Sequence, residues 1–421
     1  VKMPARQKVF IGFLFLTLIF SVLVGCGKRE NPVRTVYPFS QPWKIKRTFP
    51  SLEGNIIRDS PERWAYIYLP PQYDWEKHFP HQPGFGFPVL YLLHDFWGDH
   101  STFVDIYKVQ QIADRLIAEG EIQPMIIVMP DGSNYFGGSF YTNSDLIGRY
   151  EDYIKELMDT IDVNFHTVVN RVEDEYVPDR RYRAISGHGM GGYGAFKMAL
   201  DYDTTLFCSV SAMSPYLSFR SFLTREMIEE VFRENRISED DFSLASYKTI
   251  NPWTDSLHPE KSITQLIFAM SAAFSPHDPN DTDPDDPQFF EVFRELEKRY
   301  GVDLPFDSAR TISPGSEIWN RWMLYHDIKT LFERKSLEDK RSFAELKIYF
   351  DCGDQDYLKL YEGAQAFHDD LARYGIENTY VEYPGYENFP AGHMNFIYDR
   401  LPEILKFHSR HFPPPRYFGY K

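Results

Sequence analysis

The feature that most constrains the fold is a glycine-rich run that follows a short apolar segment near the middle of the chain. The sequence of this run is Ala184-Ile185-Ser186-Gly187-His188-Gly189-Met190-Gly191-Gly192-Tyr193-Gly194. Glycines stand two positions before and two positions after Gly189, where a tight fold of the backbone leaves no room for side chains. The pattern predicts a sharp turn from a buried strand into a helix.

The same spacing is that of the G-x-S-x-G turn that carries the nucleophile of many hydrolases, but glycine stands in place of the serine. Gly189 has no side-chain oxygen that can attack a carbonyl, which argues against an acyl-enzyme at this position. Ser186 is the nearest hydroxyl. Centring the motif on Ser186 would put Ala184 and the bulky His188 at the flanking small positions, so we reject that alignment.

The amino-terminal segment has the layout of an export signal. Basic residues precede an apolar stretch over residues 9–24, which is shorter than the ~20 residues of a membrane-spanning helix. It ends in Leu23-Val24-Gly25-Cys26, which resembles a bacterial lipobox and predicts cleavage before Cys26 and acylation of that cysteine. The alternatives are an ordinary signal with a nearby cleavage site and an uncleaved anchor.

These features predict an exported protein that is anchored in the cell envelope through a lipid on Cys26. Gly27 follows the cysteine where an aspartate would favour the inner membrane, so by analogy with lipoprotein sorting we expect the outer membrane if the organism has one. The net charge of −16 and the lack of a basic cluster beyond the first residues argue against a nucleic-acid partner.

The remaining cysteines, Cys208 and Cys352, lie in apolar, strand-like surroundings. We therefore predict two buried thiols rather than a disulfide. No cysteine or histidine spacing indicates a zinc site, and we expect neither a metal nor a cofactor.

Apolar runs of strand length alternate with helical patterns, which predicts an α/β fold with a mostly parallel sheet covered by helices on both faces. The expected strands are residues 64–69 (an edge strand), 89–93, 125–129, 183–186, 207–213, 346–350 and 379–383, and the clearest helices are 151–164 and 361–374. We expect a signal at 1–25, a tether at 26–42, one domain at 43–412 and a tail at 413–421.

The alternation breaks once, over residues 215–340, which are mostly helical and aromatic in pattern. We interpret this insertion as a lid over the carboxyl ends of the strands, where α/β sheets bind ligands. Its aromatic residues suit an aromatic acyl group or a sugar, although we expect them chiefly to fill the core of the lid: Phe289, Phe290, Trp319 and Trp322. An aspartate-rich stretch within residues 276–287 has the prolines of a solvated loop and lacks the glycine of a calcium loop.

Ordered motifs over about residues 43–412 resemble the bacterial putative-esterase family of α/β-hydrolases, which includes esterase D, enterochelin-esterase-like, feruloyl-esterase-like and mycolyltransferase-like members. The resemblance is carried by the glycine-rich turn and by Val89-Leu90-Tyr91-Leu92-Leu93-His94, Pro130-Asp131-Gly132, Gly138-Ser139-Phe140-Tyr141-Thr142-Asn143-Ser144, Gly148-Arg149-Tyr150-Glu151-Asp152-Tyr153, Asp351-Cys352-Gly353-Asp354-Gln355-Asp356 and Gly392-His393.

The resemblance implies that Asp356 is the acid and His393 the base of a triad whose nucleophile position is Gly189. Asp356 would fix the tautomer of His393 and leave the other ring nitrogen aimed at the turn. The alternative is that both residues are relics with a structural role. His188 is the family's usual residue beside the nucleophile, and we expect its side chain to point away from the cleft. Tyr141 and the nearby Asn143 are expected on a loop that borders the cleft.

A second departure from the family pattern lies in the loop His94-Asp95-Phe96-Trp97-Gly98. The family has glycine at the position of Asp95, and this loop supplies one backbone N–H to the oxyanion hole, while Met190 supplies the other. A carboxylate at position 95 adds negative charge where a developing oxyanion needs positive potential.

Our leading hypothesis is a tethered esterase-like protein that binds a small-molecule ester, a sugar, an aromatic acyl ligand or a protein partner without turning it over. The main alternative is a working ester hydrolase or acyltransferase in which Asp356 and His393 activate a water in the space left by the serine side chain. Two others remain: Gly189 is a local variant or sequencing error, or the protein is purely structural.

Overall fold

The computed structural model describes residue 40 and residues 42–73, 85–172, 175–252, 257–280, 288–295, 298–385 and 390–414. The predicted signal, Cys26 and most of the predicted tether lie outside these ranges. Among the residues described, no helix is both long enough and apolar enough to cross a membrane.

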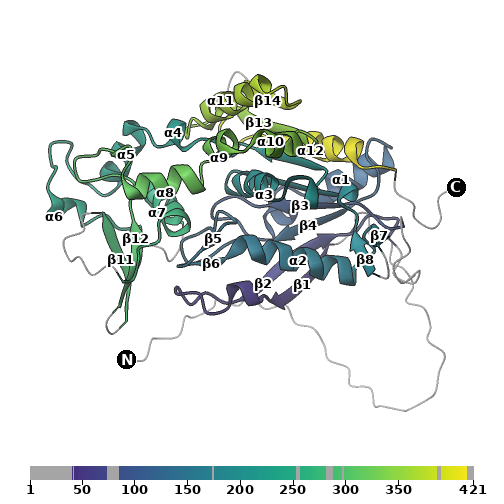
Figure 1. The fold of residues 1–421 in the computed structure, drawn as a ribbon, viewed down its shortest axis with the longest axis horizontal. Helices are drawn as coiled ribbons and strands as arrows, with labels where there is room; N and C mark the ends of the chain where they lie inside the picture. Colours follow the sequence, from purple (N-terminus) through teal and green to yellow (C-terminus); the bar gives the residue numbers. More distant parts are fainter. Residues whose placement is uncertain are drawn as a thin grey trace, which may run out of the picture. The chain divides into compact units, whose positions relative to one another are not determined.

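The central element is an eight-stranded sheet with the strand order β1-β2-β4-β3-β9-β10-β13-β14 (Figure 1). The strands are β1 (Trp43–Thr48), β2 (Glu62–Tyr68), β3 (Val89–Leu93), β4 (Ile126–Pro130), β9 (Arg183–His188), β10 (Ser209–Met213), β13 (Lys347–Gly353) and β14 (Thr379–Tyr383). From β4 to β14 all neighbours are parallel, whereas β2 is antiparallel to both β1 and β4. The α/β-hydrolase fold predicted from the sequence is confirmed.

Three two-stranded hairpins lie outside the sheet. They are β5 (Asn143–Ser144) with β6 (Gly148–Arg149), β7 (Val169–Val172) with β8 (Glu175–Pro178), and β11 (Phe289–Glu295) with β12 (Lys298–Asp303).

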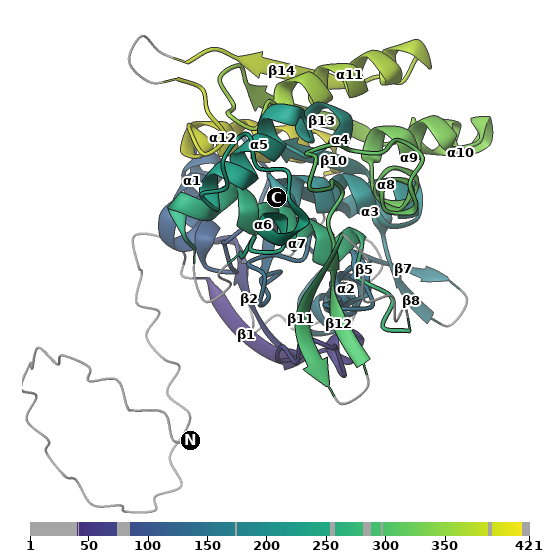
Figure 2. The ribbon, with the colours of Figure 1, turned by 90° about the vertical axis from the view of Figure 1, so that its left-hand side faces the viewer.

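Helices cover both faces of the sheet, and the side chains of β3 show how the two cores form. Leu90 and Leu92 pack in one apolar cluster with α1 (Val109–Ala118) and α12 (Ile397–His411). Tyr91 and its neighbours on the opposite face pack with α2 (Tyr150–Asn164), α3 (Met190–Leu206) and α11 (Leu360–Arg373). Successive residues of a strand point to opposite faces, so an all-apolar strand builds two cores. Figure 2 shows α1 and α12 on one side of the sheet and α3 on the other.

The predicted lid follows β10 and contains more than helices. Its helices are α4 (Phe219–Phe222), α5 (Arg225–Glu234), α6 (Leu244–Tyr247), α7 (Ser262–Phe274), α8 (Glu317–Tyr325), α9 (Ile328–Arg334) and α10 (Leu337–Phe343). The hairpin β11–β12 was not expected, and most of this insertion lies to the left of the sheet in Figure 1. The four aromatic residues singled out from the sequence are buried, as predicted: Phe289, Phe290, Trp319 and Trp322.

Three local expectations change. β2 is an inner strand because β1 pairs along its outer side, so the predicted edge strand at residues 64–69 was wrong. Cys208 and Cys352 are free thiols, and Cys352 is buried, but Cys208 is only half-buried. Of the aspartate-rich stretch, residues 281–287 lie outside the described ranges.

Candidate functional site

The predicted turn is present between β9 and α3, with Gly189 at its tip. Gly189 has φ +50° and ψ −111°, and α3 begins at the next residue. A Cβ added to Gly187 would lie 2.2 Å from the Gly191 carbonyl carbon, and one on Gly191 would lie 2.1 Å from the Leu93 carbonyl oxygen. The strand, the helix and β3 therefore approach so closely that only glycine fits at the two flanking positions.

Ser186 is not at this tip. It lies inside β9, is fully buried, and its hydroxyl oxygen accepts a hydrogen bond from Ser211 at 2.8 Å. That hydroxyl belongs to a structural network that continues to His408.

The structure brings the predicted acid and base together. Asp356 follows β13, and its Oδ2 lies 3.1 Å from His393 Nδ1. The other Asp356 oxygen accepts the backbone N–H of Leu358 at 2.9 Å, which fixes the direction of the carboxylate. Both side chains are buried. His393 Nε2 is consequently aimed at the turn, as the family pattern implies.

The side chain that meets His393 Nε2 is Asp95, from the loop after β3. Asp95 Oδ2 lies 2.9 Å from His393 Nε2, and Asp95 Oδ1 accepts the backbone N–H of Met190 at 2.7 Å. A Cβ on Gly189 would lie only 2.0 Å from Asp95 Oδ1. The carboxylate therefore fills the space into which a side chain at position 189 would extend, and it binds both the predicted base, His393, and the predicted oxyanion donor, the Met190 N–H.

This position stabilises the ionised form of Asp95. Burial raises the pKa of the carboxyl, but the imidazoles of His188 and His393 and the N–H of Met190 lower it by more, so that the pKa lies below its usual range. The carboxylate also stands at the first residue of α3, where the helix dipole favours negative charge. The negative charge predicted to oppose an oxyanion is thus held in the oxyanion's place.

His393 lies between two carboxylates, one on each ring nitrogen. Both hydrogen bonds form together only when both nitrogens carry hydrogen. Burial lowers the pKa of His393, but Asp356 and Asp95 outweigh it and raise the pKa to about 10. An imidazolium with both N–H groups bound cannot accept a proton from a nucleophile.

His188 faces the site, whereas we expected it to point away. Its ring stacks on that of His393, with the ring centres 4.9 Å apart, and its Nδ1 lies 3.6 Å from Asp95 Oδ2. Its Nε2 lies 2.9 Å from the backbone carbonyl oxygen of His393. Burial lowers the pKa of His188 to about 4, so this ring is neutral at pH 7.

The loop that carries Asp95 is held by the loop that follows β4. His94 Nε2 accepts the backbone N–H of Gly132 at 2.8 Å, and His94 Nδ1 donates to the Asp95 carbonyl at 2.8 Å. The backbone N–H of Trp97 donates to the Gly137 carbonyl at 2.9 Å. These bonds fix the backbone from which the Asp95 side chain extends.

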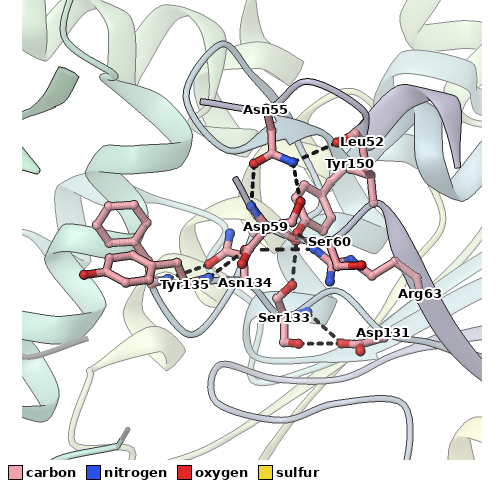
Figure 3. Close-up of polar contacts among 12 residues, drawn as sticks. Leu52, Asn55, Asp59, Ser60, Arg63, Asp131, Ser133, Asn134, Tyr135 and Tyr150 are labelled. Carbon is pink, nitrogen blue, oxygen red and sulfur yellow. Dashed lines mark hydrogen bonds and ion pairs between the residues drawn. The ribbon is translucent and has the colours of Figure 1, made fainter. Parts of the chain in front are cut away.

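A polar network fastens this second loop, residues 131–138, to the amino-terminal part of the domain (Figure 3). The Asp59 carboxylate accepts the backbone N–H of Tyr135 at 2.8 Å. Arg63 donates to the Tyr150 hydroxyl at 2.6 Å, which in turn donates to the Ser133 carbonyl at 3.0 Å. Sequence patterns did not indicate this network, because its members come from three separate stretches of the chain, residues 59–63, residues 133–135 and Tyr150.

The other predicted site residues support the centre rather than line an open cleft. Tyr141 is fully buried and donates a long hydrogen bond to the His94 carbonyl at 3.3 Å. Asn143 accepts the backbone N–H groups of Glu151 and Asp152 at the start of α2. Phe96 is half-buried and packs beside Trp97.

Tyrosines from the insertion and from the loop after β13 flank His393. The ring centres of Tyr216 and Tyr357 each lie 6.2 Å from that of His393. Tyr357 also lines a cavity of about 390 Å³ between α5, α7 and the start of α11. Four glutamates border this cavity: Glu226, Glu230, Glu234 and Glu260.

Comparisons with known proteins agree with this architecture. The model of the family described as "Putative esterase" matches residues 61–398. An endo-1,4-beta-xylanase/feruloyl esterase of Xylanibacter ruminicola is 37% identical over 115 residues, which are 25% of this chain and 14% of that protein. An esterase of Mycobacterium tuberculosis is 34% identical over 139 residues, 32% of this chain and 26% of that protein.

Among solved structures, a ferulic acid esterase has a TM-score of 0.53 at 20% identity, with coverage of 89% of this chain and 99% of that one. At this identity the likeness shows the fold. The matched regions span about a quarter or less of the two relatives named above.

Proposed function

The chain belongs to the putative esterase family, and from that premise we propose that it is a member that has lost ester hydrolysis and uses the fold to bind a ligand. The groups that an ester hydrolase uses at this centre are either absent from this chain or already hydrogen-bonded to other groups. The serine is replaced by glycine, the base is bound on both nitrogens, and the Met190 N–H is taken.

The single observation that carries the proposal is the place of the Asp95 carboxylate. It bridges the Met190 N–H and His393 Nε2 across the position of the missing serine side chain. This also argues against hydrolysis by a water in the serine's place, because Asp95 Oδ1 would lie 2.0 Å from a Cβ there. A carboxylate in an oxyanion site opposes the charge that develops in the transition state.

The ligand class that we propose is a small ester with an aromatic acyl group, with a sugar as the other candidate. The feruloyl esterase activity in the name of the Xylanibacter ruminicola relative supports the first. We expect the ligand to bind outside the buried centre, because the side chains of Asp95, His188 and His393 are only 1–8% exposed.

We also propose that the protein is exported and tethered to the cell envelope through a lipid on Cys26. The support is the sequence Leu23-Val24-Gly25-Cys26 after an apolar run. Expression in a bacterium with labelled fatty acid should label the protein and place it in the membrane fraction. Cys26→Ala should abolish the label, and a labelled Cys26→Ala protein would contradict the assignment.

The test of lost hydrolysis compares four proteins, each treated with a metal chelator before the assay: the natural chain, Gly189→Ser, Asp95→Gly and the double variant. Turnover is measured on p-nitrophenyl acetate and on methyl ferulate. We expect the natural chain and both single variants to stay near background. The double variant should gain about 10³-fold or more, because loss of a serine nucleophile costs up to ~10⁶-fold in a well-studied hydrolase.

The matched control is the double variant Asp95→Gly with Gly189→Ala, which has the same backbone and one oxygen less. It should remain at background. Rapid turnover by the natural chain would contradict the proposal, and so would full recovery by Gly189→Ser alone, which would mean that Asp95 does not block the centre.

A further inference from the structure

The blocked centre also brings together three side chains that are common metal ligands. Asp95, His188 and His393 are buried, and one donor atom from each lies within 4.8 Å of the other two. They come from the loop after β3, the end of β9 and the loop before α12, three segments far apart in the sequence. Two imidazoles and one carboxylate are a donor set that holds zinc and other divalent first-row metals in proteins.

The donor atoms lie close enough together to surround one point, since all three are within 4.8 Å of one another. Asp95 Oδ2 lies 2.9 Å from His393 Nε2 and 3.6 Å from His188 Nδ1. In a tetrahedral zinc site with bonds of about 2.0–2.1 Å, neighbouring donors lie about 3.3 Å apart. The two observed separations bracket that value, so small side-chain movements are enough to place an ion among the three atoms.

The atoms that do not face this point are bound in the way that metal ligands require. His393 Nδ1 is bound to Asp356, and His188 Nε2 to the His393 carbonyl. Asp95 Oδ1 is held by the Met190 N–H. Metal-binding histidines commonly donate their second N–H to a carboxylate or a backbone carbonyl, which fixes the tautomer and raises the basicity of the ligating nitrogen.

The charge of the cluster favours a divalent cation. Asp95 and Asp356 both face His393 in this buried centre. A bound ion would take the place of the hydrogen on His393 Nε2 and would offset the negative charge of Asp95, which is costly to bury without a partner.

We propose that Asp95, His188 and His393 form a binding site for one divalent transition-metal ion, with zinc as the first ion to test. Asp356 is a positioning residue that orients His393. The fourth position of a tetrahedral site would be taken by water, because Asp95 Oδ1 is bound to the Met190 N–H. This inference does not rest on the proposed loss of hydrolysis, since binding is measured without an ester and hydrolysis on metal-free protein.

The experiment uses the full chain, stripped with a chelator and then titrated with Zn²⁺ or Co²⁺ alone. We expect one ion per chain by elemental analysis, the visible absorption of four-coordinate Co²⁺, and a rise in the melting temperature that grows with free metal. His188→Gln and His393→Gln should each weaken binding by at least about 100-fold, and Asp356→Asn by about 10- to 100-fold.

His368→Gln is the matched control, because His368 lies on α11 and binds Asn378 outside the cluster. It should bind the ion like the natural chain. X-ray absorption of the zinc-loaded natural chain should show two imidazole ligands, a measurement that needs no variant to fold. The absence of stoichiometric binding, a single imidazole ligand, or unchanged binding in His188→Gln would each overturn the proposal.

Discussion

The centre lies between two walls, the turn after β9 and the loop after β3, and the two walls differ in the side chains that they carry. The turn after β9 has the backbone of the predicted nucleophile turn and only glycine at its tip, whereas the loop after β3 carries a carboxylate side chain, Asp95. β3 and β9 are hydrogen-bonded neighbours, so the two loops leave the sheet side by side. The carboxylate from the loop after β3 occupies the space that a side chain at Gly189 would need.

The comparison teaches that the residues at positions 95 and 189 depend on each other sterically. A serine at position 189 and the Asp95 side chain in its present conformation exclude each other sterically, because the Cβ would already lie 2.0 Å from the Asp95 oxygen. Each substitution alone looks like damage to a catalytic centre. Together they give a buried centre in which each carboxylate oxygen of Asp95 has a partner.

The largest expected effect on stability comes from Gly189→Ala, which adds only the clashing carbon. In the natural chain we expect a loss of at least about 3 kcal/mol in the free energy of unfolding, since Asp95 must leave its partners or the turn must shift. In Asp95→Gly the same change should cost about 1–2 kcal/mol, the strain of a positive φ. Denaturant unfolding of the four proteins measures this coupling.

If Gly189→Ala cost the same free energy of unfolding in the natural chain and in Asp95→Gly, the two loops would be independent of each other and the comparison would fail. Glycine at position 189 would in that case reflect only the backbone conformation of the turn.

The second expected effect is a dependence of the free energy of unfolding on pH, which tests whether Asp95 stabilises the charged form of His393. His393 has a pKa raised to about 10 from its usual value near 6.5. The stability that this provides is fully present below about pH 6.5 and is lost as the pH rises through about 10. For metal-free protein we expect a decline on the order of 3 kcal/mol between these limits, measured by denaturant unfolding.

Asp95→Asn removes one of the two negative charges on His393 and should flatten this decline, while retaining an acceptor for the Met190 N–H. A decline of the same size in Asp95→Asn would mean that the carboxylate does not stabilise the imidazolium.

A smaller effect is expected at His188, on the turn wall. His188→Gln removes the stacked ring and retains a group that can donate to the His393 carbonyl. We expect a loss of about 1 kcal/mol, the value of one buried hydrogen bond and its packing, in metal-free protein. His188→Phe keeps the stacked ring and loses the hydrogen bond. A cost above about 3 kcal/mol for glutamine would mean that the ring has a larger structural role.

The sequence predicted the backbone of this centre well and its chemistry only in part. An unbroken apolar run located β3 to the residue. β-branched and aromatic residues located β14 to the residue, and glycine spacing located the turn. The hairpin β11–β12 was missed because its alternation is weak. β1 was missed because five of its six residues are exposed, so no apolar period marks it.

The place of the Asp95 side chain could not be read from the sequence, although its charge could. Its direction depends on the backbone after β3, which is set by the bonds of His94 to Gly132 and of Trp97 to Gly137. The three candidate metal ligands were missed for the same reason. They are separated by 93 and 205 positions (188 − 95 and 393 − 188), and no local spacing rule for metal sites joins residues so far apart.

The smallest effect is expected from Asp59, which lies outside both walls and helps to fasten the loop over residues 131–138. Burial raises the pKa of Asp59, so its ionised carboxylate is not strongly favoured there. Asp59→Asn can still accept the backbone N–H of Tyr135. We expect a change within about 0.5 kcal/mol at pH 7 and the same metal affinity as the natural chain. A loss of metal binding in this variant would show that the centre depends on the anchoring of the 131–138 loop as well as on its own two walls.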